Sequence, residues 1–269
     1  MITPAHRAAA KKALEQAYAL MPEFDVKRYT CNTRIYGEVL LRLLETFGDL
    51  HGKRIVDVGA GRGILTLAIR FLGADVVAVE KYVFDHADSP MFKEGDESKV
   101  LEIWKQHDIQ PVIEDVYDLE RVVPLESFDA AVNVEVIEHL KAPKRLLDGM
   151  YRVLKPGGVA IVLTPNYGRF HARLRLAFGR NPKLDLKPFY DLGESGFIGH
   201  WREYLPDELV AMLGWAGFVE TRAWTFWDPL YQIKKRISAY TMIQTALHLV
   251  SYLLPHARYE LIAMGKKPV

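Results

Sequence analysis

The sequence predicts an α/β fold in which a doubly wound, mostly parallel sheet carries helices on both faces. Short apolar runs alternate with stretches of helical periodicity from residue 53 to residue 163, as is typical of parallel strands joined by helices. The first apolar run leads directly into a glycine-rich segment, residues 59–63, which is followed by a helical pattern. Glycine is required where the backbone turns with a positive φ or approaches a ligand closely. We therefore expect a site at the carboxyl ends of the strands.

The first half of the chain is expected to begin with two helices, at 5–20 and at 35–47, because apolar residues recur there at helical spacing. Pro22 and a polar stretch around residues 25–28 separate the two helices. Alternation of strands and helices then follows. The expected elements are a strand at 53–58, a helix at 62–72, a strand at 75–80, a helix near 97–107, and strands at 110–114 and 127–134.

The second half is expected to continue with a helix at 143–154, and Pro156-Gly157-Gly158 marks a sharp stop after it. The regular pattern lapses from Pro165 to Trp201, and such a long insertion in a compact domain is usually functional or mobile. The remaining expected elements are strands at 157–163 and 218–226, a helix at 206–216, and a last strand at 259–264 that runs antiparallel.

These elements suggest four segments along one chain. The expected organisation is an N-terminal helical cap at 1–50, a nucleotide-binding core at 51–164, an acceptor lid at 165–204, and a C-terminal part of the same sheet domain at 205–269 that contains a long apolar helix.

Composition excludes several classes of protein. The chain has 269 residues and a formal net charge of +1, so bulk nucleic-acid binding through phosphate neutralisation is not expected. Cys31 is the single cysteine, which excludes an intrachain disulfide framework and fits a reducing compartment. The Ala- and Lys-rich N-terminus has no apolar core of the kind found in signal peptides. We therefore expect a cytoplasmic protein.

The glycine spacing distinguishes between nucleotides. A dinucleotide-binding loop has the spacing G-x-G-x-x-G, whereas here the glycines are spaced G-x-G-x-G and Ile64 stands at the position of the third glycine. This argues against an NAD-dependent dehydrogenase. A tight strand-to-helix turn with no ligand remains an alternative for the loop alone.

Four later features accompany the loop in a fixed order. Glu80 ends the second strand, Asp115 follows the third, residues 128–140 hold a strand followed by Glu-x-x-Glu-His, and Arg152–Gly158 precede the next strand. Together they resemble the class I S-adenosylmethionine (SAM) methyltransferases over roughly residues 50–165. The resemblance implies a Rossmann-like sheet and SAM as cofactor. It implies SAM contacts from Asp57, Gly59, Ala60, Gly61, Gly63, Glu80, Lys81, Asp115, Val116, Asn133 and Glu135.

The Glu135-x-x-Glu138-His139 segment resembles a motif of two subgroups, the ubiquinone-biosynthesis O-methyltransferases of the methyltransferase-11/23-like group and the small-RNA 2′-O-methyltransferases. In both, such residues hold a divalent cation beside the SAM methyl group, and the RNA enzymes add a later histidine, for which His200 is the counterpart here. The resemblance thus implies a Mg²⁺, Mn²⁺ or Zn²⁺ site at Glu135, Glu138, His139 and His200. Leu140 stands where the RNA subgroup has a second histidine, which disfavours RNA as the acceptor.

Two interpretations of this motif stay open. Either a metal is bound, or His139 acts as a general base or a packing residue without one. We expect the two glutamates and His139 to share one face of a helical turn. His200 is expected to reach them when the lid closes over the substrate.

The expected function is SAM-dependent O-methylation of a hydroxyl on a small molecule, a glycan or a secondary metabolite, with His139 and His200 as catalytic residues. The acceptor contacts are expected in the lid, from Tyr167, Arg169, Phe170, Arg173 and Trp201. Alternatives are an N-methyltransferase, a quinone or lipid O-methyltransferase, and a catalytically silent SAM-fold module that binds partners.

An uncharged run at 237–254 allows three interpretations. It can pack on the sheet as an amphipathic helix, form a homodimer interface, or touch a membrane surface through residues 233–254, with Lys234-Lys235-Arg236 as a basic collar.

Overall fold

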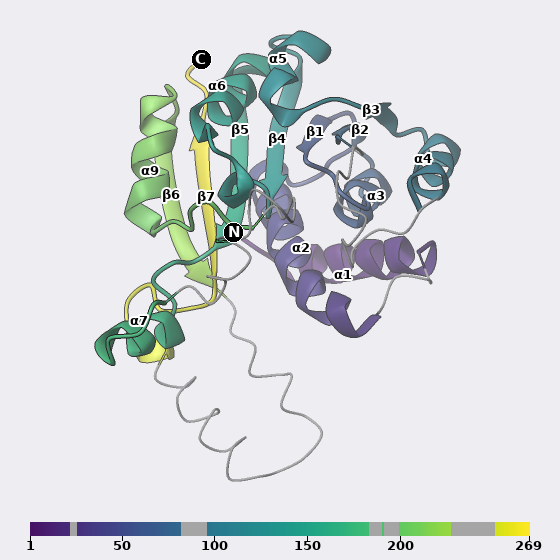
Figure 1. Ribbon diagram of the computed structural model, residues 1–269. Helices are drawn as coiled ribbons and strands as arrows, with labels where there is room; N and C mark the ends of the chain where they lie inside the picture. The colour runs from purple at the N-terminus through teal and green to yellow at the C-terminus, as the bar shows by residue number, and fades with distance from the viewer. Residues whose placement is uncertain (22–25, 82–95, 183–189, 191–198, 227–250) are drawn as a thin grey trace.

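The computed structural model describes residues 1–21, 26–81, 96–182, 190, 199–226 and 251–269. Its sheet has seven strands in the order β3-β2-β1-β4-β5-β7-β6 (Figure 1). The strands are β1 (Arg54–Val58), β2 (Asp75–Val79), β3 (Gln110–Val112), β4 (Phe128–Val134), β5 (Leu154–Pro165), β6 (Val219–Phe226) and β7 (Glu260–Lys266). The helices are α1 (Pro4–Ala19), α2 (Val26–Phe47), α3 (Ile64–Phe71), α4 (Asp96–Gln106), α5 (Leu119–Val122), α6 (Pro143–Val153), α7 (Phe170–Ala177) and α9 (Pro206–Trp215), with 3-10 turns η1 (Val116–Asp118) and η2 (Ile137–His139).

The direction of the strands confirms the predicted fold class. Strands β1 to β5 pair in parallel, and β7 runs antiparallel to both β5 and β6. Strand order reverses between β1 and β4, since β2 and β3 lie on one side of β1 and β4 and β5 on the other. Ligands of doubly wound sheets bind at such a reversal, beyond the carboxyl ends of the strands. The loops after β1 and β4 are therefore placed where a site is expected.

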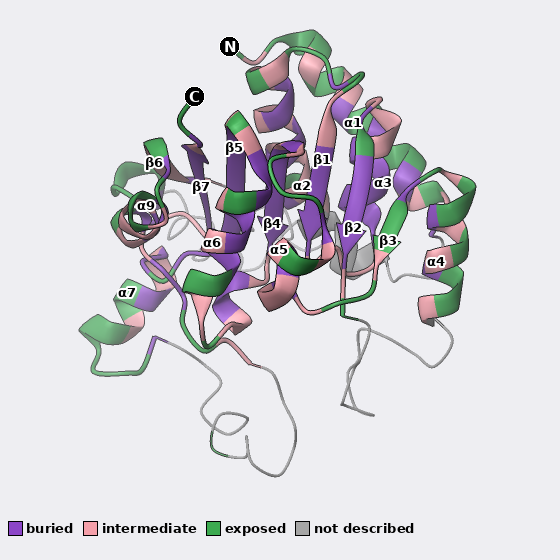
Figure 2. Cartoon of the chain, turned by 90° about the horizontal axis from the view of Figure 1, so that it is seen from above, coloured by how far each residue is buried: buried purple, intermediate pink, exposed green. Residues whose placement is uncertain are grey.

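Helices cover both faces of the sheet (Figure 2). Alternate residues of each central strand point to opposite faces: Ile55 packs into the core on the side of α1 to α4, whereas Val56 and Val58 pack on the side of α5, α6 and α9. These strands are apolar on both faces because both faces are buried. The two cores hold the carboxyl ends of β1 and β4 rigidly in place.

Several elements differ from the prediction, among them β5, which begins at Leu154 and not at residue 157. Helix α2 begins at Val26, not at residue 35. Its first turns carry Lys27 and Arg28 and lack apolar periodicity, but extending an existing helix adds one hydrogen bond for each residue fixed. Helix α7 lies within the stretch that showed no clear period. The prediction of a long helix at 237–254 falls outside the described residues except for 251–254.

The segment after β5 is fastened to the segment before β7. The Asn166 side-chain amide donates to the carbonyl oxygens of His256 and Arg258, at 2.8 and 2.7 Å, and the backbone N–H of Phe170 donates to Ala257 at 2.8 Å. A buried polar side chain with both donor hydrogens paired fixes the local backbone. Among the helices described here, none combines the length and apolar character needed to cross a membrane.

Candidate active site

The glycine loop after β1 adopts left-handed backbone at Gly59, Gly61 and Gly63, but for different reasons. A Cβ atom at Gly59 would lie 2.5 Å from Val136 Cγ2, and one at Gly63 would lie 2.1 Å from Trp104 Nε1. At Gly61 a Cβ would meet nothing within 4 Å. Gly59 and Gly63 therefore allow close packing within the protein. Gly61 borders open space, as a residue does where backbone approaches a ligand.

Charged residues surround this loop. The Gly61 N–H donates to Glu80 Oε2 at 2.7 Å, and Lys81 Nζ lies 3.2 Å from Asp115 Oδ2. The other Asp115 oxygen accepts from the Tyr117 N–H at 3.0 Å and so caps η1. Burial raises the pKa of Glu80, and hydrogen bonds from the Gly61 and Lys81 backbones partly offset this rise. The predicted SAM contacts Glu80, Lys81 and Asp115 thus lie together, with Ala60 in the loop itself and the buried Val116 in η1.

Two other predicted SAM contacts lie beneath the loop. Asp57 is 1% exposed and accepts a hydrogen bond from the Thr66 hydroxyl at 2.7 Å, which joins β1 to α3. Asn133 is fully buried and donates to the Val58 carbonyl at 2.7 Å, which joins β4 to β1. Both residues support the loop from inside the sheet.

The turn after β4 differs in shape from the expected helical turn. Glu135 has a φ of 57°, and only Ile137–His139 form a helix, of the 3-10 type. The expectation that both glutamates and His139 share one helical face is therefore wrong. Glu138 is fully buried and accepts from the Thr164 hydroxyl at 2.8 Å. Val136 contacts Gly59, as its distance to a Gly59 Cβ shows, so this turn packs against the glycine loop.

The structure brings together three of the four predicted metal ligands. Side-chain ligand atoms of Glu138, His139 and His200 all lie within 4.8 Å of one another, and the two imidazole rings meet edge to face with centroids 4.8 Å apart. The backbone N–H groups of Trp201 and Arg202 donate to the Glu138 carbonyl at 2.7 and 3.2 Å. These bonds hold His200 beside His139, so closure of a lid is not needed to bring it there.

Glu135, the fourth predicted ligand, lies beside a further acid that the motif does not include. Glu260, at the start of β7, is 2% exposed. Burial, then the charges of Glu260 and Glu138, raise the pKa of Glu135. Burial and then the charge of Glu138 raise the pKa of Glu260 to about 8. Burial likewise raises the pKa of Glu138 to about 7.

The residues present fit a divalent cation. Glu135 Oε1, Glu138 Oε1 and Glu260 Oε2 are buried and have no hydrogen-bond partner within the described part of the chain. Buried carboxylate oxygens are normally paired. Tetrahedral ligands at about 2.1 Å from a metal lie about 3.4 Å apart. The ligand atoms of Glu138, His139 and His200 lie within 4.8 Å of one another, so they would have to approach by up to roughly 1.4 Å on binding a metal.

The predicted acceptor contacts are divided between the surface and the interior. Tyr167 and Trp201 are 42% and 38% exposed. Arg169 is instead buried and paired with Glu203, and Arg173 donates to the Gly168 carbonyl at 2.5 Å. Arg169 is thus committed to a pair inside the protein, whereas Arg173 is exposed, and the acceptor contacts stay a prediction. Glu203 and Glu260 belong to no motif, and only their arrangement in space places them at the site.

Comparison with known proteins identifies the family. A profile described as "Methyltransferase domain" matches residues 30–220, and the chain belongs to this family. The chain is 31% identical over 199 residues to a ubiquinone biosynthesis O-methyltransferase of Dinoroseobacter shibae, covering 71% of this chain and 70% of that protein. It is 30% identical over 154 residues to the mitochondrial ubiquinone biosynthesis O-methyltransferase of Dictyostelium discoideum, covering 54% of this chain and 45% of that longer protein.

A solved structure has a similar fold. The S-adenosylmethionine-dependent methyltransferase from Mesorhizobium loti superposes with a TM-score of 0.55 at 20% identity, covering 84% of this chain and 96% of that one. The fold, the family and these relatives together make this chain a class I SAM-dependent methyltransferase with SAM as its cofactor.

Two glycine substitutions should separate binding from folding. Gly61→Ala places its Cβ in open space, so we expect a stability loss of about 1–2 kcal/mol from the left-handed φ and at least a tenfold weaker Kd for SAM. Gly63→Ala places its Cβ against the buried Trp104, so we expect a larger loss of stability, about 3 kcal/mol. Urea unfolding without ligand and calorimetry with SAM measure the two effects. If Gly61→Ala bound SAM with the affinity of the wild type, the glycine loop would not be part of the SAM-binding site.

Proposed function

We propose that this methyltransferase methylates a hydroxyl oxygen of a quinone-type small molecule, with a divalent cation held by Glu138, His139 and His200. One observation carries the proposal: His200 meets Glu138 and His139 at a turn that packs against the glycine loop through Val136 and Gly59. The names of the two relatives support the quinone-type acceptor. A glycan or secondary-metabolite hydroxyl was the first expectation from sequence, and the relatives favour the quinone alternative.

The chain's own residues have three tasks in this reaction. The glycine loop, with Glu80 and Asp115 beside it, would hold SAM at the carboxyl end of β1, and the turn after β4 would face its sulfonium methyl group. In a metal-free site His139 would accept the proton of the hydroxyl, because imidazole exchanges protons near neutral pH. With a cation bound, Glu138, His139 and His200 would hold it, and the proton would pass to water. The remaining requirement is alignment of oxygen, methyl carbon and sulfur, together with exclusion of water. A bound cation would stabilise the alkoxide form of the acceptor.

The buried Glu138 favours the metal interpretation over a metal-free base. Its Oε1 has no hydrogen-bond partner in the described structure and lies beside the two imidazoles, where a cation would pair it. Two imidazoles and a carboxylate suit Mn²⁺ or Zn²⁺, and Mg²⁺ accepts the oxygen donors. Nitrogen as the acceptor, and a silent SAM-binding module, remain the competing proposals.

Chelation tests the metal. The purified enzyme is incubated with SAM and a short-chain hydroxylated quinol, and release of S-adenosylhomocysteine and a mass gain of one methylene are followed. We expect EDTA to suppress turnover and added Mn²⁺, Mg²⁺ or Zn²⁺ to restore it, because the cation lowers the pKa of the hydroxyl. His200→Ala should respond much less to added metal.

Matched substrates separate the alternatives. The fully O-methylated form of the same quinol has no free hydroxyl and should give no product, whereas an amine analogue that is methylated faster would favour the nitrogen acceptor. Full activity in EDTA would leave His139 as a plain general base. SAM binding without turnover on any of these acceptors would favour the silent module.

The remaining proposals concern the compartment in which the enzyme works and the partners that it binds. We place the enzyme in the cytoplasm, on the single Cys31, and propose a small-molecule acceptor over nucleic acid, on the net charge of +1. Membrane contact or a homodimer through 233–254 also stays a proposal, since nearly all of that segment falls outside the described residues.

A further inference from the structure

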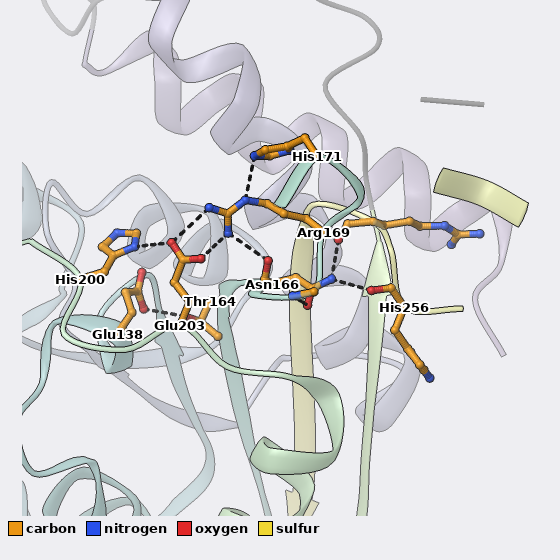
Figure 3. A network of polar contacts seen from close by, with 10 residues as sticks. Glu138, Thr164, Asn166, Arg169, His171, His200, Glu203 and His256 are labelled. Carbon is orange, nitrogen blue, oxygen red and sulfur yellow. Dashed lines mark hydrogen bonds and ion pairs between the residues drawn. The ribbon is translucent and has the colours of Figure 1, made fainter. Parts of the chain in front are cut away.

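His200 is held from one side by a carboxylate. Its Nδ1 lies 3.0 Å from Glu203 Oε1 (Figure 3). The same carboxylate forms an ion pair with the guanidinium of Arg169, which is always charged and keeps Glu203 ionised. An ionised carboxylate can only accept hydrogen bonds. The hydrogen in this contact must therefore be on Nδ1 of His200.

Glu203 is itself fixed by a buried arginine. Arg169 is 7% exposed and forms an ion pair with Glu203. It also donates to the Asn166 carbonyl at 3.0 Å and to His171 Nε2 at 3.1 Å. Figure 3 shows these contacts as one continuous network from His256 through Asn166, Arg169 and Glu203 to His200. The network connects the histidine to the fastened segments after β5 and before β7.

We propose that Glu203, held in place by Arg169, is a positioning residue that fixes the ring of His200 as the Nδ1–H tautomer and leaves Nε2 as its basic nitrogen. Neutral imidazole in water prefers the opposite tautomer, with hydrogen on Nε2. Without Glu203, a hydrogen on Nε2 of His200 would therefore block the nitrogen that has to bind the metal. A carboxylate on the second ring nitrogen is the usual way in which proteins fix a metal-binding histidine. The inference rests on the proposed function for the task of His200.

Nitrogen NMR tests the tautomer without any turnover. The protein is labelled with ¹⁵N-histidine and measured metal-free at a pH at which the ring is neutral, and His200→Gln assigns the signal by its loss. We expect His200 in the wild type to show a protonated Nδ1 and an unprotonated Nε2. In Glu203→Ala the hydrogen should move largely to Nε2, and Mn²⁺ affinity should fall about 10–100-fold.

Two further variants keep the test independent of folding. Glu203→Ala leaves Arg169 buried without its partner, so the double variant Arg169→Met with Glu203→Leu removes both charges, a replacement that proteins often tolerate. It should show the same change of tautomer. Glu38→Gln is the matched control, because Glu38 pairs with Arg42 at 2.6 Å on α2, and it should alter neither the His200 signal nor the Mn²⁺ affinity.

The outcomes separate this inference from the metal proposal. A His200 that keeps hydrogen on Nδ1 in Glu203→Ala or in the double variant overturns the inference. A change of tautomer together with weaker Mn²⁺ binding supports both. A change of tautomer in a protein whose wild type binds no Mn²⁺ supports the positioning role and rejects the metal.

Discussion

Replacing His139 with alanine is expected to lower kcat by about 10²–10⁴-fold, the usual contribution of a positioned acid or base. His139 lies within 4.8 Å of both Glu138 and His200 through its ligand atoms, and its side chain is 31% exposed and so within reach of an acceptor. The loss should be large whether the imidazole binds a cation or accepts the proton. The Kd for SAM should stay within a few fold, because the glycine loop is separate from this side chain.

The control is His51→Ala. His51 is an exposed histidine, 76% exposed, that pairs with Asp49 at 2.7 Å outside the site, so its removal should leave kcat unchanged. Activity of His139→Ala within threefold of the wild type would take His139 out of the chemistry. Equal losses of kcat and SAM affinity would instead indicate that the turn had lost its packing against the glycine loop.

The parallel core was predictable from sequence because each strand is an apolar run and each helix has its own period. The antiparallel position of β7 was also expected and is confirmed. The early start of α2 at Val26 was not predictable from a pattern, since polar residues fill its first turns. Helix α7 was missed for a similar reason, because the stretch from Pro165 to Trp201 shows no regular apolar period.

The site was predicted only as far as the motif extends. Glu138, His139 and His200 converge as expected, whereas Glu135 departs because its left-handed backbone precedes the 3-10 turn. Glu203 lies close to His200 in sequence, but no motif spacing indicates it as a residue of the site. Glu260 comes from a strand far along the chain, and only the antiparallel insertion of β7 next to β5 brings it to this end of the sheet. Contacts of this kind depend on tertiary structure and leave no local pattern.

The buried acids also predict an unusual dependence of stability on pH. Glu138 and Glu260 have pKa values of about 7 and about 8, raised first by burial, against an ordinary value of 4.5, and burial raises the pKa of Glu135 in the same direction. Between the ordinary and the raised values the folded state binds more protons than the unfolded state. The free energy of unfolding therefore falls as the pH rises through this range. Glu203 has a pKa lowered to about 2, so it changes the free energy of unfolding only at a more acidic pH.

We therefore expect the metal-free protein to lose stability as the pH rises from about 5 to about 8, by about 1.4 kcal/mol for each unit of raised pKa that is crossed. Urea unfolding in EDTA at a series of pH values measures it. Glu260→Gln removes one carboxyl group that binds a proton in the folded state. The free energy of unfolding of this variant should therefore fall less steeply with pH than that of the wild type. Saturating Mn²⁺ should reverse the trend, because a cation binds the ionised carboxylates and stabilises the folded state more as the pH rises. Metal-free stability that is flat or rising over this range, with Glu260→Gln following the wild type, would mean that these carboxyl groups are ionised in the folded protein without a cation.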